Sequence, residues 1–264
     1  MNGKLKSKEM KKMLTNENYF SPENQMKYMG SSQFKAFQKC EAAALAEIKG
    51  EYERKITPSL LVGQYVDAYF EKTLDIFKAK NPQIFTLKGE LKAEYKQAER
   101  IIERIEKDEL FMEYMSGAKQ VILTGEIEGV PVKIKIDSYH KDKIVDMKIM
   151  KDLKPIWVEE KGLLTFAEAW GYDIQGAIYK EIEGNDLPFI LAVATKEEEP
   201  DLELIEIPKH YLDASLEIVK SKIVRFDAIK KGLIEPERCG KCDYCKRTKK
   251  LHRVISLEEL EYAQ

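Results

Sequence analysis

Two acidic side chains and a lysine recur at short spacing between residues 132 and 149. The segment 132–139 alternates apolar and polar residues, which predicts a strand with Asp137 on its polar face. After a short polar turn, Asp146 and Lys148 lie two residues apart on a second predicted strand and therefore share one face. If the two strands pair as a hairpin, all three side chains meet at one edge of the sheet.

Such a cluster is consistent with a metal site. Two carboxylates within reach of each other repel, and each needs a cation or a proton. A divalent metal satisfies that need, and hard oxygen ligands suit Mg²⁺ or Mn²⁺. Lys148 could then orient or deprotonate a metal-bound water, or stabilise the charge on a phosphate. The strand pattern taken alone slightly favours the alternative, a solvated hairpin with charged side chains on its outer face.

The four cysteines form a second candidate site. Cys239, Cys242 and Cys245 lie close together near the C-terminus, and Cys40 could supply a fourth ligand for a tetrahedral metal site. Soft thiolates select zinc or an iron–sulfur cluster. A site of this kind would join the first predicted helix to the end of the chain. Reduced cysteines without a ligand are the alternative.

Four other positions could contribute to the acidic cluster. Gln175 and Tyr179 are four residues apart on a predicted helix, so they share a face and offer an amide and a phenol to a phosphate or a base; helix packing alone explains the pair better. Asp67 follows Gly63 on an earlier predicted helix. Glu126 ends the strand before the hairpin and could be a further ligand of the metal. A surface glutamate with no role in metal binding explains this position about as well.

The elements that must position these residues are helices followed by strands. This order predicts one α/β domain over residues 1–264, with a central mixed sheet, a flexible lead-in at 1–18 and a basic, Cys-rich C-terminal element at 239–253. The predicted helices are 31–50, 58–80, 89–114, 165–181, 210–231 and 256–262, the predicted strands are 120–127, 132–139, 143–149, 189–195 and 202–207, and 239–245 is predicted to be a tight loop.

Composition narrows the class of protein. A chain of 264 residues that is 44% hydrophobic can bury a core. The 44 Lys and Arg nearly balance the 46 Asp and Glu, so net charge does not indicate a nucleic-acid binder. The basic termini suit a phosphate backbone or soluble tails. There is no apolar run for a membrane or signal peptide and no secreted disulfide pattern, so a cytoplasmic protein is expected.

At this point the residues resemble a known family. The motif resembles the PD-(D/E)XK nuclease superfamily, and more closely its RecB-like and RecE-like branch, which includes phage and prophage exonucleases of the exodeoxyribonuclease VIII type. The resemblance covers nearly the whole chain, although Ile136 stands where the superfamily has its proline. It implies a restriction-endonuclease-like core. The matching residues are Asp137, Asp146, Met147, Lys148, Gln175 and Tyr179, with the segments 31–40, 63–67 and 238–245.

The resemblance implies a role for each residue of the motif. Asp137 and Asp146 would bind Mg²⁺ or Mn²⁺ together with the backbone carbonyl of Met147. Lys148 would position or activate the attacking water. Gln175 and Tyr179 would contact DNA or brace the site.

Asp67 and the cysteines match the family less closely. Asp67 stands where RecB-like relatives often carry a histidine, which leaves its role open, although an acid there could bind a divalent ion. The early Cys40 and the late cysteine trio resemble the ligands of a 4Fe–4S cluster in several RecB-like nucleases. The late spacing is tighter than theirs, so Zn²⁺ or no metal stays open.

The implied function is metal-assisted hydrolysis of phosphodiester bonds in linear double-stranded DNA. By the same resemblance, the enzyme would degrade one strand from its 5′ end and leave a 3′ tail for a single-strand annealing protein during phage-type recombination in a bacterial host. The resemblance leaves a homo-oligomer open and implies no membrane. The alternatives are an endonuclease of the same fold and a catalytically silent module that binds DNA ends or protein.

Overall fold

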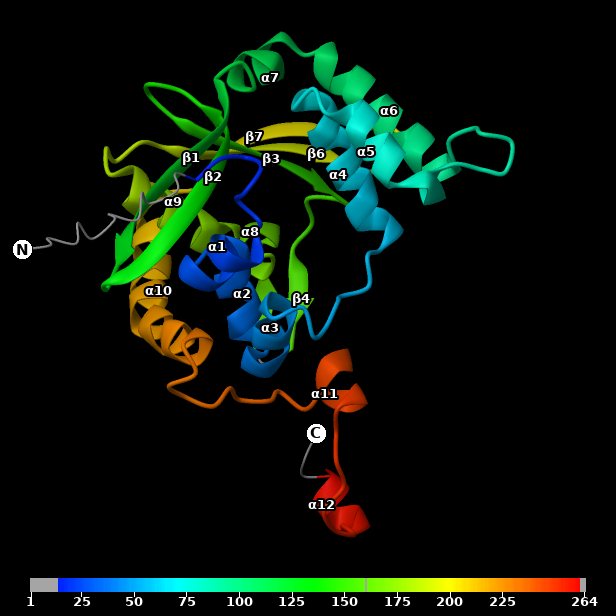
Figure 1. Ribbon diagram of the computed structural model, residues 1–264. Helices are drawn as coiled ribbons and strands as arrows, with labels where there is room; N and C mark the ends of the chain where they lie inside the picture. The colour runs from blue at the N-terminus through cyan, green and yellow to red at the C-terminus, as the bar shows by residue number, and fades with distance from the viewer. Residues whose placement is uncertain (1–13, 160, 262–264) are drawn as a thin grey trace, which may run out of the picture.

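Five strands form the central sheet of the computed structural model, which describes residues 14–159 and 161–261 (Figure 1). Their order across the sheet is β1-β2-β3-β6-β7. Neighbouring strands are antiparallel except β3 and β6, which are parallel, so the sheet is mixed as predicted. The strands are β1 (Ala118–Ile127), β2 (Val130–Tyr139), β3 (Ile144–Met150), β6 (Phe189–Thr195) and β7 (Leu202–Glu206).

The central strand β3 is buried on both faces of the sheet. Val145 and Met147 belong to the core on one face, whereas Ile144 and Met150 belong to the core on the other. Because side chains alternate along a strand, residues 146 and 148 lie on the same face as Ile144. The structure therefore gives these two positions the shared face that the alternation predicts.

Helices of the first half of the chain cover one face of the sheet (Figure 1). Buried side chains of α4 and α6, such as Tyr65 and Ile101, share a core with Met147. Helix α4 starts at Thr57, whose side chain accepts a hydrogen bond from the Leu60 N–H and caps the helix. The helices on this face are α4 (Pro58–Phe70), α5 (Leu74–Lys80), α6 (Ala93–Glu106) and α7 (Glu109–Tyr114), with the 3₁₀ turn η1 (Pro82–Ile84).

The opposite face is covered by the N-terminal helices and by helices from the second half of the chain (Figure 1). The ring of Phe226 on α10 lies 5.2 Å from the ring centroids of both Phe34 and Phe37 on α2. These aromatic contacts join the N-terminal helices to the long helix α10. The helices are α1 (Pro22–Lys27), α2 (Ser31–Lys39), α3 (Glu41–Ile48), α8 (Phe166–Ala169), α9 (Tyr172–Glu183) and α10 (Lys209–Lys230).

The helix predicted from Ser31 to Gly50 is two helices in the structure. Cys40 separates α2 from α3 with an extended backbone, at φ −167° and ψ 108°. The break turns the Cys40 side chain toward Cys245, with 3.5 Å between the two sulfur atoms. The residue that caps the start of α2 is Gly30, which has no side chain to accept a hydrogen bond from the first turn. The apolar residues Phe34, Phe37, Ala44 and Ile48 keep a helical spacing across this break, so periodicity could not reveal it.

Three other long predicted helices are also broken, in each case at a helix cap or at a residue with a left-handed backbone. Lys72, with φ 60°, separates α4 from α5. The Asp108 side chain accepts a hydrogen bond from the Phe111 N–H and starts α7 as a new helix. Gly171, with φ 64°, separates α8 from α9. Local capping and left-handed backbone residues therefore interrupt patterns that look continuous in the sequence.

The remaining differences lie in short elements. The hairpin β4 (Ile156–Val158) and β5 (Gly162–Leu164) was not predicted, because three residues are too few to show alternation. The C-terminal region holds α11 (Asp243–Arg247), within the predicted loop, and α12 (Leu257–Glu261). Residues 1–13 of the predicted lead-in lie outside the described residues. Residues 16–18 belong to a turn, before which the Thr15 N–H donates to Asn18 Oδ1 at 2.8 Å.

Among residues 14–159 and 161–261, no helix is both long enough and apolar enough to cross a lipid bilayer.

Candidate active site

The candidate site lies where β2 and β3 separate. The two strands pair only through Ser138 with Val145 and Tyr139 with Ile144. Continuing that register would place Asp137 opposite Asp146. Instead of extending the backbone ladder, the Asp137 carboxylate accepts a hydrogen bond from the Met147 N–H at 3.2 Å. The side chain therefore occupies the gap between the strands.

The Asp146 carboxylate is buried and held from two sides. Its Oδ1 accepts a hydrogen bond of 2.7 Å from Gln175 Nε2 on α9. Its Oδ2 forms an ion pair with Lys148 and accepts no further hydrogen bond among the described residues. An acceptor-only carboxylate oxygen in this position remains able to bind a cation.

The charges in the gap shift one another's protonation. Burial, followed by the nearby Asp146 carboxylate, raises the pKa of Asp137 to about 7. Burial lowers the pKa of Lys148, but the carboxylates of Asp146 and Asp137 outweigh it and raise the pKa above its ordinary value. Lys148 is therefore a cation at neutral pH. The Asp137 carboxyl is then protonated in about half of the molecules.

Helix α9 is held close to the sheet so that Gln175 can reach β3. A Cβ atom at Gly176 would lie only 2.5 Å from the ring of Phe189 on β6, so no larger residue fits without a shift of the helix. Tyr179, one turn after Gln175, donates its hydroxyl to the Lys135 carbonyl at 2.9 Å. Gln175 thus contacts an acid of the site, whereas Tyr179 fixes the backbone of β2 two residues before Asp137.

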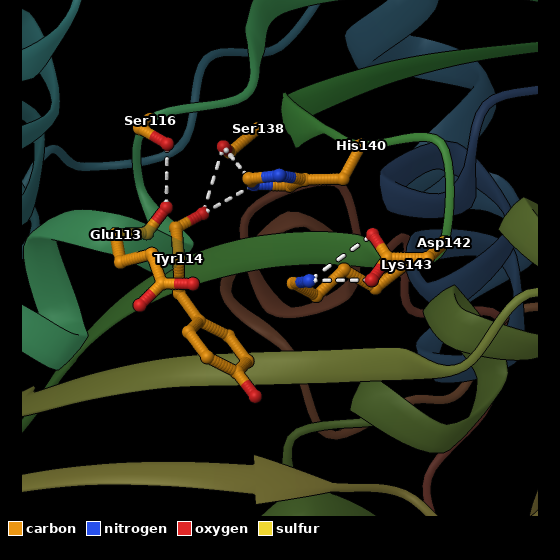
Figure 2. A network of polar contacts seen from close by, with 7 residues as sticks. All are labelled: Glu113, Tyr114, Ser116, Ser138, His140, Asp142 and Lys143. Atoms are coloured by element: carbon orange, nitrogen blue, oxygen red, sulfur yellow. Dashed lines mark hydrogen bonds and ion pairs between the residues drawn. The ribbon is translucent and has the colours of Figure 1, made fainter.

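A polar network holds the end of β2 next to Asp137 (Figure 2). The Ser138 hydroxyl donates to the Tyr114 carbonyl at 2.9 Å, and His140 Nε2 lies 2.7 Å from the same oxygen. A bond from the ring to a carbonyl requires the proton on Nε2. Gly117 N–H donates to Ser138 Oγ at 2.9 Å. The turn between α7 and β1 is thereby attached to the residue that follows Asp137.

Asp67 approaches the gap from α4, on the other face of the sheet from Gln175. It lines a small cavity of about 10 Å³ together with Asp137, Gln120 and Met147. Burial, followed by the charge of Asp137, raises the pKa of Asp67 well above its usual range. The structure therefore brings Asp67 close enough to Asp137 for the two carboxylates to repel.

Glu126 lies away from the other predicted residues. It is exposed near the turn between β1 and β2 and pairs with Pro131 in the sheet register. In the same register, the residue of β1 opposite Asp137 is Gln120, six positions earlier. Because a strand rises about 3.3 Å per residue, the strand itself separates Glu126 from the gap.

Two residues near the site were not predicted. Gln120 Nε2 donates to Asp137 Oδ1 at 3.3 Å. Lys35 of α2 has its ammonium 5.2 Å from the ring centroid of Tyr172, the same distance at which Lys148 lies from that ring. Burial, followed by the charge of Lys148, lowers the pKa of Lys35 to about 8. Gln120 lies at no motif spacing, and the resemblance over 31–40 implied no role for Lys35, so only the tertiary structure places both residues beside the site.

The four cysteines converge as the sequence analysis predicted they could. The sulfur atoms of Cys40, Cys239, Cys242 and Cys245 all lie within 4.8 Å of one another. Burial raises the pKa of the Cys239 thiol, but hydrogen bonds from the Cys242 and Lys241 N–H groups and from the neighbouring thiols together outweigh it and lower the pKa to about 7. Four thiols at this separation fit a tetrahedral metal or a cluster with four thiolate ligands.

Comparison with known proteins identifies the family. The family described as "PDDEXK-like domain of unknown function (DUF3799)" matches residues 30–248. The chain belongs to this PDDEXK-like family.

A solved structure supports the same assignment. The crystal structure of a protein named "Putative exonuclease", from Eubacterium rectale, is 47% identical to this chain, with a TM-score of 0.90. The match covers 94% of this chain and 98% of the Eubacterium rectale chain. No curated protein matches the chain. The PDDEXK-like membership agrees with the fold observed here, a mixed sheet flanked by helices.

Proposed function

We propose that this protein is a divalent-metal-dependent deoxyribonuclease, with its active site in the gap between β2 and β3. The observation that carries the proposal is the buried Asp146, held by Gln175 and Lys148 while its Oδ2 accepts no further hydrogen bond among the described residues. Together with Asp137, it offers the carboxylate oxygens that Mg²⁺ or Mn²⁺ prefers.

The residues of the gap fit a cation well. Asp137 and Asp146 would hold it, together with the backbone carbonyl of Met147, the residue after Asp146. The raised pKa of Asp137 arises partly from the negative charge of Asp146, which a bound cation would neutralise. A divalent metal bound there would lower the pKa of a coordinated water and offset negative charge on the phosphate. Asp67, on the α4 side, adds a further carboxylate near Asp137.

The protein side chains supply orientation and electrostatics. Because its pKa is raised, Lys148 keeps its proton, so it acts as a hydrogen-bond donor that orients the attacking water and stabilises negative charge on the phosphate. Gln175 fixes Asp146 in one orientation. Tyr179 fixes the β2 backbone near Asp137. Lys35 adds a second ammonium group for the phosphate backbone.

The cysteine site has a structural role in this proposal. Cys40 joins the break between α2 and α3 to the C-terminal trio, so a bound ion or cluster would hold the two ends of the chain together. Both a 4Fe–4S cluster and Zn²⁺ fit four thiolates.

The finer activity follows the resemblance and the name of the Eubacterium rectale protein. We propose an exonuclease that degrades one strand of linear duplex DNA from the 5′ end and leaves a 3′ single strand for an annealing protein in phage-type recombination. An endonuclease of the same fold is the nearest alternative, and a silent module that binds DNA ends is the other. Assembly of several copies around the DNA would suit a processive exonuclease.

One digestion experiment separates these possibilities. Linear and covalently closed duplex DNA are incubated with Mg²⁺ or Mn²⁺, each strand labelled at one end, with Asp146→Asn as the inactive control. Loss of the linear form alone, with label released from 5′ ends, supports the exonuclease. Cleavage of both forms supports the endonuclease. If the wild-type protein cuts neither form with either metal, the nuclease proposal fails.

A further inference from the structure

Gln120, the third residue of the edge strand β1, has an unusual backbone conformation. Its φ is +53°, a left-handed value that residues other than glycine rarely adopt within a strand. The flanking pairs of Lys119 with Ser138 and Val121 with Ile136 place it directly opposite Asp137. Strained residues of this kind persist where the surroundings fix them, and they cluster at functional sites.

The amide of Gln120 has one satisfied end and one unsatisfied end. Nε2 donates to Asp137 Oδ1 at 3.3 Å. Oε1 is buried and accepts no hydrogen bond among the described residues. When Asp137 is ionised, as it must be to bind a cation, rotating the amide would not help, because Oε1 would then face a carboxylate oxygen and two acceptors would repel. Asp137 therefore fixes the orientation that leaves Oε1 without a partner.

The site has room for a molecule that would use this acceptor. Gln120, Asp67, Asp137 and Met147 line the same cavity of about 10 Å³, which is close to the space that one water needs. A water there would meet polar groups from three different elements, α4, β1 and β2. Such a water would donate to Oε1 and satisfy it.

We propose that Gln120 is a positioning residue for the divalent cation, holding Asp137 through Nε2 and a water of the cation's hydration shell through Oε1. This inference rests on the proposed nuclease function. Mg²⁺ and Mn²⁺ sites formed by few carboxylates retain several waters. Side chains that hold the ligands and waters of a metal commonly change its affinity 10–100-fold when they are replaced. The strained backbone and the buried acceptor are then features of cation binding rather than of folding.

Two variants test the proposal by metal affinity. Gln120→Met keeps the length of the side chain and removes both polar atoms. Gln120→Gly relieves the left-handed backbone, so it folds even if the first variant does not. Gln64→Met, at an exposed position on α4, is the matched control. The affinity for Mn²⁺ is measured in each protein from the electron paramagnetic resonance signal of free Mn²⁺, and folding is checked by circular dichroism.

The expected result is a 10–100-fold weaker Mn²⁺ affinity in both Gln120 variants and an unchanged affinity in Gln64→Met. DNA cleavage by the variants should recover as Mn²⁺ is raised to saturation, because only cation binding is impaired. An unchanged Mn²⁺ affinity in the folded glycine variant would overturn the proposal. Cleavage that stays low at saturating Mn²⁺ would also overturn it, since that result indicates a different defect.

A failure of the proposed nuclease function would give a different set of results. In that case the wild-type protein itself would neither bind Mn²⁺ through Asp146 nor cut DNA, and Asp146→Asn would change nothing. If the wild-type protein does both and the Gln120 variants match it, the nuclease stands and the role of Gln120 alone is refuted.

Discussion

The ion pair between Lys148 and Asp146 makes a prediction about stability that depends on metal. The side chains are 19% and 3% exposed, respectively, so the pair is largely buried. Replacing Lys148 with methionine leaves Asp146 buried with only Gln175 as its partner. Removing one member of a buried pair costs about 3–5 kcal/mol, because an uncompensated charge remains. We expect Lys148→Met to lower the free energy of unfolding by about that amount when no divalent metal is present.

The same substitution should strengthen the stabilisation by a cation. In the wild-type protein, the Lys148 ammonium neutralises the Asp146 oxygen that a cation would use. Without it, Mg²⁺ or Mn²⁺ meets a more negative site, so the gain in stability on adding metal should be larger in the variant. DNA cleavage should still be lost, because the donor that orients water and phosphate is missing.

The assay is urea unfolding of the wild-type protein and Lys148→Met, with EDTA and with a series of Mn²⁺ concentrations. Lys107→Met, which breaks an exposed ion pair with Glu103, is the control and should cost at most about 0.5 kcal/mol. The reasoning is refuted if Lys148→Met is as stable as the wild-type protein in EDTA, or if added Mn²⁺ stabilises it less.

Three further predictions address other parts of the molecule. Cys242→Ser should lower thermal stability while a metal-saturated preparation keeps its cleavage activity; unchanged melting would show that the four cysteines hold nothing. Gly176→Ala should lower stability by about 1–3 kcal/mol in urea unfolding, because its Cβ would lie 2.5 Å from the Phe189 ring and push α9 outward; a wild-type unfolding curve would contradict the close packing. Finally, the folded pKa of Asp137 is about 7 against an ordinary value of 3.8, so folding takes up a proton between those values. Stability without metal should therefore fall as pH rises from about 4 to 7, and this slope should diminish in Asp137→Asn when both proteins are unfolded across that range.

Much of the architecture was predictable because it depends on local pattern. The alternation in 132–139 and the buried run of 189–195 predicted strands within two residues of β2 and β6. Tyr95, Ile101 and Ile105 recur at helical spacing in the sequence and form part of the buried face of α6. What failed were the helix lengths, since a cap at Asp108 and a left-handed residue at Lys72 stop a helix without changing its periodicity.

The candidate site was likewise predictable only in part from the sequence. The sequence by itself determined which side chains share a face, because Asp146 and Lys148 are two apart on a strand and Gln175 and Tyr179 are four apart on a helix. It also carried the motif by which the family was recognised. Those relations are fixed by the geometry of single elements, whose repeat is short and regular.

Only the tertiary structure decided what those faces meet. Strands β2 and β3 separate beyond the pair of Ser138 with Val145, and Asp137 fills the gap that this opens. The register of β1 places Gln120 opposite Asp137 and leaves Glu126 six residues further along the strand. The packing of α2 against α9 places Lys35 beside the ring of Tyr172. These relations join residues distant in the chain through strand register and helix packing, which depend on the fit of many side chains at once. No local spacing in the sequence encodes them.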